Sequence, residues 1–598
     1  MKYSNERSAQ IIASLLKQHG VRKIVASPGG TNFPIVTMLQ YDPYFQLFSC
    51  VDERSAAYMA CGLAATSGEK VAITCTGATA SRNYLPALTE AYYRKLPVIA
   101  ITSYNGTRNI GQMLPQNIDR TRIQKDVALE SVDVPPVEND EDAEYATRLV
   151  NQALIASERH GGGPVHINVS TTYNATWSEG EPPVAHCVRH YYFDESLNDK
   201  SLPSLESYKR IAIFIGAHRL FAHETEQSIS DFAQRHDAIV FCDHTSNYHG
   251  FGEFHASLAI GNMPQGREHR DRLIPDLIIH IGEISGDYPT MGLLESAHVP
   301  TWRISMDGEL RDKFHTLEAV FECSEVMFFQ HYLKQCTVNN HTLLDAWTAL
   351  DQQARTALPE LPFSNRGIAQ HLSERIPSNS IIHFSILNSL RSWNCFRLDS
   401  SIRAFCNTGG FGTDGALSTL LGSALAEPET LHFAVVGDLA FFYDMNALGN
   451  RALGSNLRIL LINNGQGGEF RLPESQSSSL GDVIDPYVSA KGHFVPQWPL
   501  ASDADHVSPA QAWCEALGFK YLHASSYKDI EDVLPEFLSN NVGAPVILEC
   551  HTTIEQENQA MNQSKGLVFS GSSVDKAKYI AKRILPNSVV DMAKSLLK

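Results

Sequence analysis

The fold is decided by Val435-Val436-Gly437-Asp438-Leu439 and, one helical segment later, by Leu460-Leu461-Ile462-Asn463-Asn464-Gly465. Each stretch is a short apolar run that ends in an oxygen-bearing side chain beside a glycine. About one βαβ crossover separates Asp438 from Asn464, so we expect both at the carboxyl ends of parallel strands, where open α/β sheets bind ligands. A carboxylate and a carboxamide are hard oxygen donors that suit Mg²⁺ with a phosphate in its shell. Ordinary strand-to-loop turns remain the alternative, because Gly-Asp and Asn-Gly are common turn dipeptides.

Composition narrows the class of protein. The chain has 598 residues, 43% of them hydrophobic and 19% charged, so several globular domains are expected. A formal net charge of −18 argues against a nucleic-acid partner. The 11 cysteines form no C-x-x-C pair, so neither a zinc site nor a disulfide framework is indicated. No apolar run is long enough for a membrane span and the N-terminus lacks a signal-peptide layout, so we expect a cytoplasmic enzyme without a membrane partner.

Short apolar strands alternate with helical segments along the whole chain. This pattern predicts an α/β fold of three consecutive doubly wound parallel-sheet domains. A polar stretch near residues 179–204 and the segment LPELPF near residue 360 separate them. The predicted ranges are 1–185, 186–355 and 356–555, followed by a C-terminal tail or helix at 556–598.

A second informative motif is Asp52-Glu53-Arg54, which precedes a helix of small residues. A glutamate in this place also complements the helix dipole, which is the plain structural explanation. Together with the Gly-Asp and Asn-Asn motifs, however, the pattern resembles the thiamine-diphosphate-dependent enzymes, and within them the MenD family. The resemblance covers nearly the whole chain and rests on motifs in the same order: Ser27-Pro28-Gly29, Asp52-Glu53-Arg54, Asn388-Ser389-Leu390, Gly412 to Thr419, Gly437-Asp438-Leu439 and Asn463-Asn464.

The resemblance implies a pyrimidine, a central and a pyrophosphate domain, with thiamine diphosphate and Mg²⁺ as cofactors. Glu53 would be the catalytic proton partner of the aminopyrimidine ring. The implied metal ligands are Asp438, the Asn464 side chain and the main-chain oxygen of Gln466. The implied cofactor-binding residues also include Ser389, Asp414, Gly415, Gly437, Leu439 and Ala440. Ser389 and Gln116 would lie near the reacting centre, although Gln116 is equally well explained as a polar loop residue.

The sequence departs from the MenD pattern at the arginines that bind its carboxylate-rich substrates. By resemblance, these positions fall on Gly30-Thr31, Asn105, Asp287-Tyr288, Thr408 and Trp393. A bidentate arginine–carboxylate contact is not replaced by threonine or asparagine without leaving a charge unmatched. Thr413 also stands where the family has an apolar residue beneath the cofactor.

We therefore predict decarboxylation of a pyruvate-like 2-oxo acid with carboligation of the acyl carbanion to a carbonyl acceptor. The alternatives are a simple decarboxylase, an acetolactate-synthase-like enzyme, a MenD-type synthase with altered substrate recognition, or a cofactor-binding protein without activity. The retained Glu53 argues against the last, since binding alone does not need it. The resemblance further implies a homodimer or homotetramer with active sites at the subunit interface, and the sequence shows no signature of FAD in the central domain.

Overall fold

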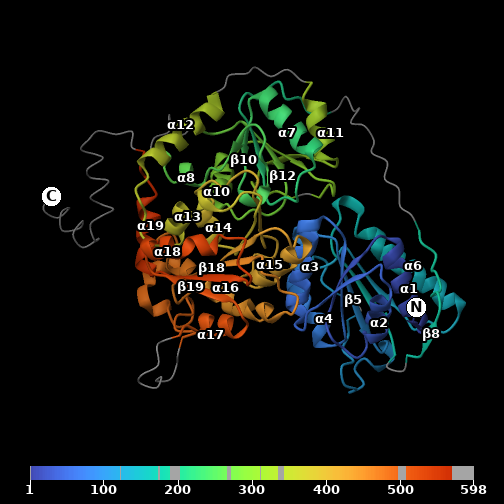
Figure 1. The fold of residues 1–598 in the computed structure, drawn as a ribbon. Coiled ribbons are helices and arrows are strands. Elements are labelled where there is room, and N and C mark those ends of the chain that lie inside the picture. The colour runs from blue at the N-terminus through green and yellow to red at the C-terminus, as the bar shows by residue number, and fades with distance from the viewer. Residues whose placement is uncertain are drawn as a thin grey trace, which may run out of the picture.

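The computed structural model describes residues 2–120, 123–172, 175–188, 202–264, 271–309, 311–334, 342–495 and 507–568. These residues form three sheets, each of six parallel strands flanked by helices, which confirms the predicted α/β fold (Figure 1). The basic segment at 577–586, part of the predicted tail, lies outside the described residues. The boundaries between the domains stay predictions.

The first sheet has the strand order β3-β2-β4-β5-β7-β6. Its buried strands are short apolar runs such as Val71–Cys75, which are typical of a parallel sheet covered on both faces. A separate antiparallel pair joins β1 to β8. The strands are β1 Lys2–Ser4, β2 Lys23–Ala26, β3 Gln46–Ser49, β4 Val71–Cys75, β5 Val98–Tyr104, β6 Glu130–Val134, β7 Val165–Ser170 and β8 Trp177–Glu179. The helices are α1 Arg7–Gln18, α2 Phe33–Tyr41, α3 Glu53–Ser67, α4 Thr79–Asn83, α5 Leu85–Tyr93 and α6 Asp140–Ala156.

The central sheet has the order β11-β10-β9-β12-β13-β14, so its strand order reverses between β9 and β12. Ligands of open α/β sheets bind at the carboxyl ends of strands beside such a reversal. The strands are β9 Ile211–Ile215, β10 Ile239–Phe241, β11 Glu253–Phe254, β12 Leu277–Ile281, β13 Thr301–Ile304 and β14 Leu317–Phe321. The helices are α7 His223–His236, α8 Ser257–Ile260, α10 Tyr288–Ala297, α11 Glu325–Tyr332 and α12 Thr342–Ala357.

The third sheet repeats the topology of the first, with the order β16-β15-β17-β18-β20-β19. Its strands are β15 Ile381–Phe384, β16 Arg403–Cys406, β17 His432–Gly437, β18 Leu457–Asn463, β19 Lys520–Ala524 and β20 Val546–His551. Its helices are α13 Asn365–Leu372, α14 Asn388–Trp393, α15 Ala416–Ala426, α16 Asp438–Asp444, α17 Pro509–Ala516, α18 Tyr527–Phe537 and α19 Ile554–Gln563. Strands β17 and β18 are direct neighbours, as the predicted metal site requires.

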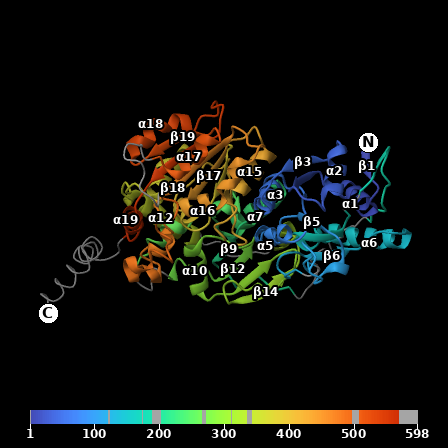
Figure 2. The ribbon, with the colours of Figure 1, turned by 90° about the horizontal axis from the view of Figure 1, so that it is seen from below.

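Helices α3 and α15 join the first sheet to the third, and they lie side by side in both views (Figures 1 and 2). Glycines at the crossing let the two backbones approach: a Cβ on Gly62 would lie 2.0 Å from the Thr419 carbonyl oxygen, and one on Gly422 would lie 1.9 Å from that of Met59. The run of small residues in α3 is therefore a packing surface as well as part of a family motif. No helix in the described ranges is long and apolar enough to cross a membrane.

Candidate active site

The predicted metal residues meet at the carboxyl edge of the third sheet. Asp438 begins α16 immediately after β17, and it is only 5% exposed. Its carboxylate accepts the Leu439 backbone N–H at 2.8 Å and lies near the backbone N–H groups of Gly465 and Gln466. Burial raises the pKa of Asp438 to about 6. The loops after β17 and β18 thus converge on one carboxylate.

The donor atoms around Asp438 are oxygens. No lysine, arginine or histidine in the described part of the chain forms an ion pair with this buried carboxylate. The Asn464 side-chain oxygen accepts the Gln466 N–H at 3.2 Å, and Gln466 has a buried Oε1 without a hydrogen-bond partner. A buried carboxylate among oxygen donors and without a cation of its own fits a divalent metal such as Mg²⁺.

Ser389 lies on the short helix α14, at the carboxyl end of neighbouring strand β15. It is buried, and its hydroxyl accepts a long 3.4 Å hydrogen bond from Ser385. The preceding residue, Asn388, faces Glu469 and approaches the loop that follows Asn464. Ser389 is therefore placed at the same sheet edge as the metal residues.

Asp414 and Gly415 precede α15 and contact the first domain. The Tyr58 hydroxyl donates to Asp414 Oδ2 at 3.1 Å, and the Tyr58 ring packs on Gly415, where a Cβ would lie 2.3 Å from the ring. Gly415 also has a φ of 78°, so a side chain here would meet both strain and a clash. The Asp414 side chain thus faces Tyr58 of the same chain, and the backbone that follows it enters α15.

Glu53 occupies the first turn of α3, and the third domain fixes that turn. Asp52 caps the helix by accepting the Ser55 N–H at 3.0 Å, and it also accepts the Asn446 side chain at 2.9 Å. Glu53 itself is half-buried and accepts a 3.4 Å hydrogen bond from Asn83, the last residue of α4. The carboxylate predicted to be catalytic is held by its neighbours but is still accessible.

Gln116 lies on the exposed loop between β5 and β6, with a left-handed φ of 62°. No side-chain contact ties it to Glu53 or Asp438 among the hydrogen bonds of the described residues. His244, in the central domain, is buried, and its Nε2 lies 3.1 Å from the Trp393 carbonyl oxygen and 3.0 Å from that of Phe396. Burial lowers its pKa to about 3, so it is a neutral core histidine.

Several positions that lack the family's arginines face the protein interior. Thr31 is 3% exposed, and its hydroxyl contacts Thr76 Oγ1 at 2.7 Å and the Ser103 carbonyl oxygen at 2.8 Å. Trp393 and Thr408 are fully buried. Arg391, two residues before Trp393, does reach the site edge, but it pairs with Glu469 at 2.6 Å. The cation available on α14 is therefore already neutralised.

One residue near this site was not singled out by the sequence. Arg120 is 4% exposed, and none of its three guanidinium nitrogens has a hydrogen-bond partner. It belongs to no motif of the family, and a lone arginine in a loop gives no signal in a single sequence. Its isolation is visible only in three dimensions.

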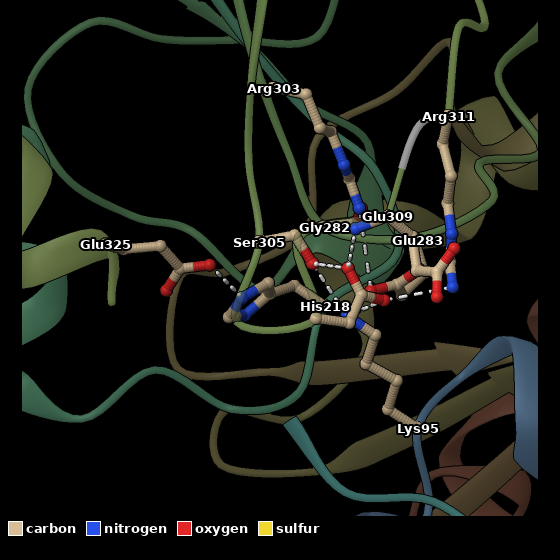
Figure 3. Close-up of polar contacts among 10 residues, drawn as sticks. Lys95, His218, Gly282, Glu283, Arg303, Ser305, Glu309, Arg311 and Glu325 are labelled. Carbon is tan, nitrogen blue, oxygen red and sulfur yellow. Dashed lines mark hydrogen bonds and ion pairs between the residues drawn. The ribbon is translucent and has the colours of Figure 1, made fainter. Parts of the chain in front are cut away.

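A larger cavity lies elsewhere, between the first and central domains. It has a volume of about 640 Å³ and is lined by the loops after β9, β12 and β13 and by residues around Lys95. Figure 3 shows Lys95 pointing into a group of central-domain side chains. Its Nζ lies 3.0 Å from Glu283 Oε1 and 3.1 Å from Asp307 Oδ2, and it donates to Ser305 Oγ at 2.9 Å. The Lys95 ammonium group is thus paired with the carboxylates of Glu283 and Asp307.

Comparison with known proteins agrees with this geometry. A model of the thiamine pyrophosphate enzyme N-terminal TPP binding domain matches residues 6–123. A relative from Bacteroides fragilis, 2-succinyl-5-enolpyruvyl-6-hydroxy-3-cyclohexene-1-carboxylate synthase, is 32% identical, over 92% of this chain and 97% of its own. Synthases of the same name from Bacteroides thetaiotaomicron and Christiangramia forsetii are 30% and 27% identical, over 92% of this chain and 96% and 97% of their own.

The similarity spans all three sheets, and the residues around Asp438 fit the cofactors that it implies. The chain is thus an enzyme that uses thiamine diphosphate and a divalent metal, of the kind that combines decarboxylation with carboligation. It belongs to the MenD family of thiamine-diphosphate-dependent enzymes.

Proposed function

We propose that this enzyme decarboxylates a small, pyruvate-like 2-oxo acid and joins the remaining acyl group to a carbonyl acceptor. The observation that supports the chemistry is the buried Asp438 carboxylate, which lies among oxygen donors and has no cation within the described residues. When bound, thiamine diphosphate supplies a nucleophilic carbon that adds to carbonyl groups. The protein must hold the diphosphate, move one proton and exclude water.

The protein's own residues divide these tasks. Asp438, the Asn464 side chain and the Gln466 main-chain oxygen would hold the metal. Backbone N–H groups of Leu439 and Ala440, in the first turn of α16, would face the diphosphate, with Gly437 and the Asp414-Gly415 loop completing its site.

Glu53 would exchange a proton with the cofactor's aminopyrimidine ring. Its place in the first turn of α3, fixed by Asp52 and Asn446, sets the direction of that carboxylate. Ser389 and Gln116 would donate hydrogen bonds near the reacting carbonyl, with Gln116 arriving from its exposed loop. In this role, Gln116 would have to move toward the sheet edge.

The substrate is proposed to differ from that of the named relatives. Those proteins are synthases of 2-succinyl-5-enolpyruvyl-6-hydroxy-3-cyclohexene-1-carboxylate. Among the positions of the family's arginines, Thr31, Thr408 and Trp393 are buried here, whereas Asn105 and Tyr288 are exposed. The nearby Arg391 is paired with Glu469. A multiply charged substrate would therefore find fewer free cations in this site. A MenD-type synthase with altered recognition is the second candidate, favoured by identity over nearly the full length of both chains.

The test is CO₂ release from pyruvate and from 2-oxoglutarate by enzyme supplied with thiamine diphosphate and Mg²⁺. Adding aldehydes, keto-sugars or isochorismate, followed by mass analysis of the products, identifies the acceptor. Pyruvate as the better donor supports the proposal, and efficient joining of 2-oxoglutarate to isochorismate favours the second candidate. No CO₂ from any simple 2-oxo acid overturns both.

Substitution of the proposed proton partner separates catalysis from binding. Glu53→Gln should abolish turnover while leaving cofactor binding, measured by calorimetry, nearly unchanged. Glu224→Gln is the control, since Glu224 also lies in the first turn of a helix, α7 of the central domain, where it is exposed. Equal activity of the two variants would exclude Glu53 from the reaction.

We also propose that the active unit is a homodimer or homotetramer with sites between subunits. Large apolar side chains are exposed close to both halves of the site, including Val51 at 76% and Tyr443 at 52%. Tyr487 is 92% exposed on the segment after the metal loop. Grouped apolar exposure of this kind favours an interface. Sedimentation analysis tests this: a 66.1 kDa particle with full activity would contradict it.

A further inference from the structure

The buried guanidinium of Arg120 lacks a counter-ion. Its Nε, Nη1 and Nη2 are buried without partners, and no carboxylate of the described residues lies within ion-pair distance. The nearest candidate, Asp133, is already engaged. It accepts the Tyr104 hydroxyl at 2.8 and 3.0 Å and the Asn168 side chain at 2.7 Å. A buried charge without a partner is strongly unfavourable, so a conformation that keeps one indicates a missing ligand.

The surrounding residues fix the guanidinium in one place. Its carbon lies 4.7 Å from the centroid of the Tyr104 ring, in a cation–π contact that leaves its N–H edges free. On another side lies Gly77, where an added Cβ would be in ordinary van der Waals contact with Nη1, at 3.4 Å. The arginine is therefore positioned before any ligand arrives.

A cavity of about 310 Å³ opens in front of Arg120, at the small end of the range for ligand sites. Polar residues that line it include Arg82, Tyr84, Thr102, Asp119 and His166. Both ring nitrogens of His166 are engaged, by Thr102 at 2.7 Å and Ser131 at 2.9 Å. The buried Tyr84 hydroxyl lies close to the side chains of Ser27 and Cys75. The buried Arg120 guanidinium, whose three nitrogens have no hydrogen-bond partner, is the group that suits this cavity to an anion.

The cavity adjoins the proposed catalytic carboxylate. Gly77 lies in the loop after β4, at the carboxyl edge of the first sheet, where α/β folds bind ligands. That loop leads into α4, whose last residue, Asn83, donates to Glu53 at 3.4 Å. Tyr84, the next residue, lines the cavity. One short segment thus contacts both Glu53 and the cavity of Arg120.

We propose that Arg120 binds a substrate carboxylate that is retained in the product. This inference rests on the proposed function. The carboxylate that leaves as CO₂ is excluded, because a guanidinium on it would stabilise the substrate more than the transition state. With a pyruvate-like donor, the bound group belongs to the carbonyl acceptor, because pyruvate has no second carboxylate. A donor with a distal carboxylate, such as 2-oxoglutarate, would place the bound group on the 2-oxo acid and favour the second candidate function. Arg120 then supplies the recognition that the absent family arginines do not.

The first experiment measures anion binding to the holoenzyme by calorimetry, with acetate as the probe and uncharged acetamide as its isostere. Wild-type enzyme should bind acetate at least tenfold more tightly than acetamide. Arg120→Gln should lose about 10- to 100-fold in acetate affinity, as expected for charged hydrogen bonds. Arg120→Lys should recover part of this loss. Arg403→Gln, which removes a half-buried arginine paired with Glu427, is the control and should bind acetate normally.

The second experiment identifies the source of the carboxylate by kinetics. If it is on the acceptor, Arg120→Gln raises the KM for glyoxylate about 10- to 100-fold and leaves that for acetaldehyde unchanged. If it is distal on the donor, the KM for 2-oxoglutarate rises while that for pyruvate does not. A rise in either of these KM values supports the proposal. If the KM for glyoxylate and the KM for 2-oxoglutarate are both unchanged, the proposal is overturned.

The binding measurement is independent of turnover, so it stands if the proposed function fails. Conversely, the enzyme could be active while wild type and Arg120→Gln bind acetate equally well. That result would leave the proposed function intact and refute the role of Arg120. Should Arg120→Gln not fold, the comparison of acetate with acetamide on wild-type enzyme decides: equal affinities overturn the inference.

Discussion

Two cavities of this enzyme, one beside Lys95 and one beside Arg120, differ in how their positive charges are paired. In the larger one, Lys95 of the first domain contacts Glu283, Asp307 and Ser305 of the central domain within 3.1 Å (Figure 3). Arg311 also pairs with both carboxylates, at 3.2 and 2.9 Å. In the smaller one, Arg120 has no such partner. The first group of charges is complete within the protein, whereas the second is complete only with a ligand.

Whether the charges that line a cavity are paired distinguishes a structural cavity from a binding site better than the volume of the cavity does. A large cavity whose charges are paired can hold two domains together without binding anything. A small cavity with an unpaired, fixed cation contributes little to stability, because the charge is desolvated without compensation. We therefore assign domain packing to the Lys95 group and substrate recognition to the Arg120 cavity.

The largest effect is expected from Lys95→Met. It leaves Glu283 and Asp307 with fewer cationic partners in a largely buried place, and it should lower the free energy of unfolding by about 2–4 kcal/mol. Thermal melting of the purified variant measures this. Lys313→Met removes an exposed pair with Glu295, which solvent screens, so it should lower the melting temperature much less than Lys95→Met does. Equal melting temperatures of the two variants would show that the Lys95 group does not hold the domains.

The next effect is a dependence on pH. Burial opposes ionisation of Asp307, but the Lys95 charge and the Ser305 hydrogen bond lower its pKa to about 2, from 3.8. A depressed carboxyl pKa contributes stability that is complete above pH 3.8 and is lost as the pH falls toward 2. The Asp307→Asn variant has no carboxyl group at this position and so lacks this pH-dependent contribution to stability. The difference in free energy of unfolding between wild type and Asp307→Asn, obtained from thermal melting, should therefore narrow from about pH 5 to pH 2, by roughly 1 kcal/mol after solvent screening.

A gap of constant size over that range would mean that Asp307 is not stabilised as a carboxylate. Titrations elsewhere in the chain are shared by both proteins and cancel in the difference. The difference in stability between wild type and Arg120→Gln should not narrow in this way between pH 5 and pH 2, since no carboxylate of the described residues pairs with Arg120.

Arg120→Met should change the free energy of unfolding in the opposite direction to Lys95→Met. Replacing an unpaired buried cation by an apolar side chain removes a desolvation penalty, so we expect a gain of about 1 kcal/mol in the free energy of unfolding. Thermal melting in buffer without carboxylates measures it, and acetate should raise the melting temperature of wild type only. A loss as large as that of Lys95→Met would mean that Arg120 has a partner within the protein.

The sequence predicts most of the fold because buried parallel strands are continuous apolar runs. The continuous apolar runs Ile211–Ile215 and Leu277–Ile281, for example, form strands β9 and β12. Edge strands β14 and β19 escaped prediction, since each is covered on one side only and its sequence mixes exposed with buried residues.

The candidate site divides in the same way. Asp438 and Asn464 could be identified because a local motif places an oxygen donor at a strand end. Arg120 could not, because its isolation depends on Tyr104, Gly77 and Asp133, which come from other parts of the first sheet. The catalytic and metal-binding roles of the site residues stay predictions.

The smallest effect compares two arginines of the same cavity. Arg82 is exposed where Arg120 is buried, so water and salt screen its charge. Arg82→Gln should reduce acetate affinity only about two- to threefold at low salt, and the effect should vanish near about 0.5 M sodium chloride, where the Debye length is about 4 Å. The loss in Arg120→Gln should persist at that salt concentration, because its site is shielded from ions. If both losses disappear with salt, the anion binds at the mouth of the cavity and not at Arg120.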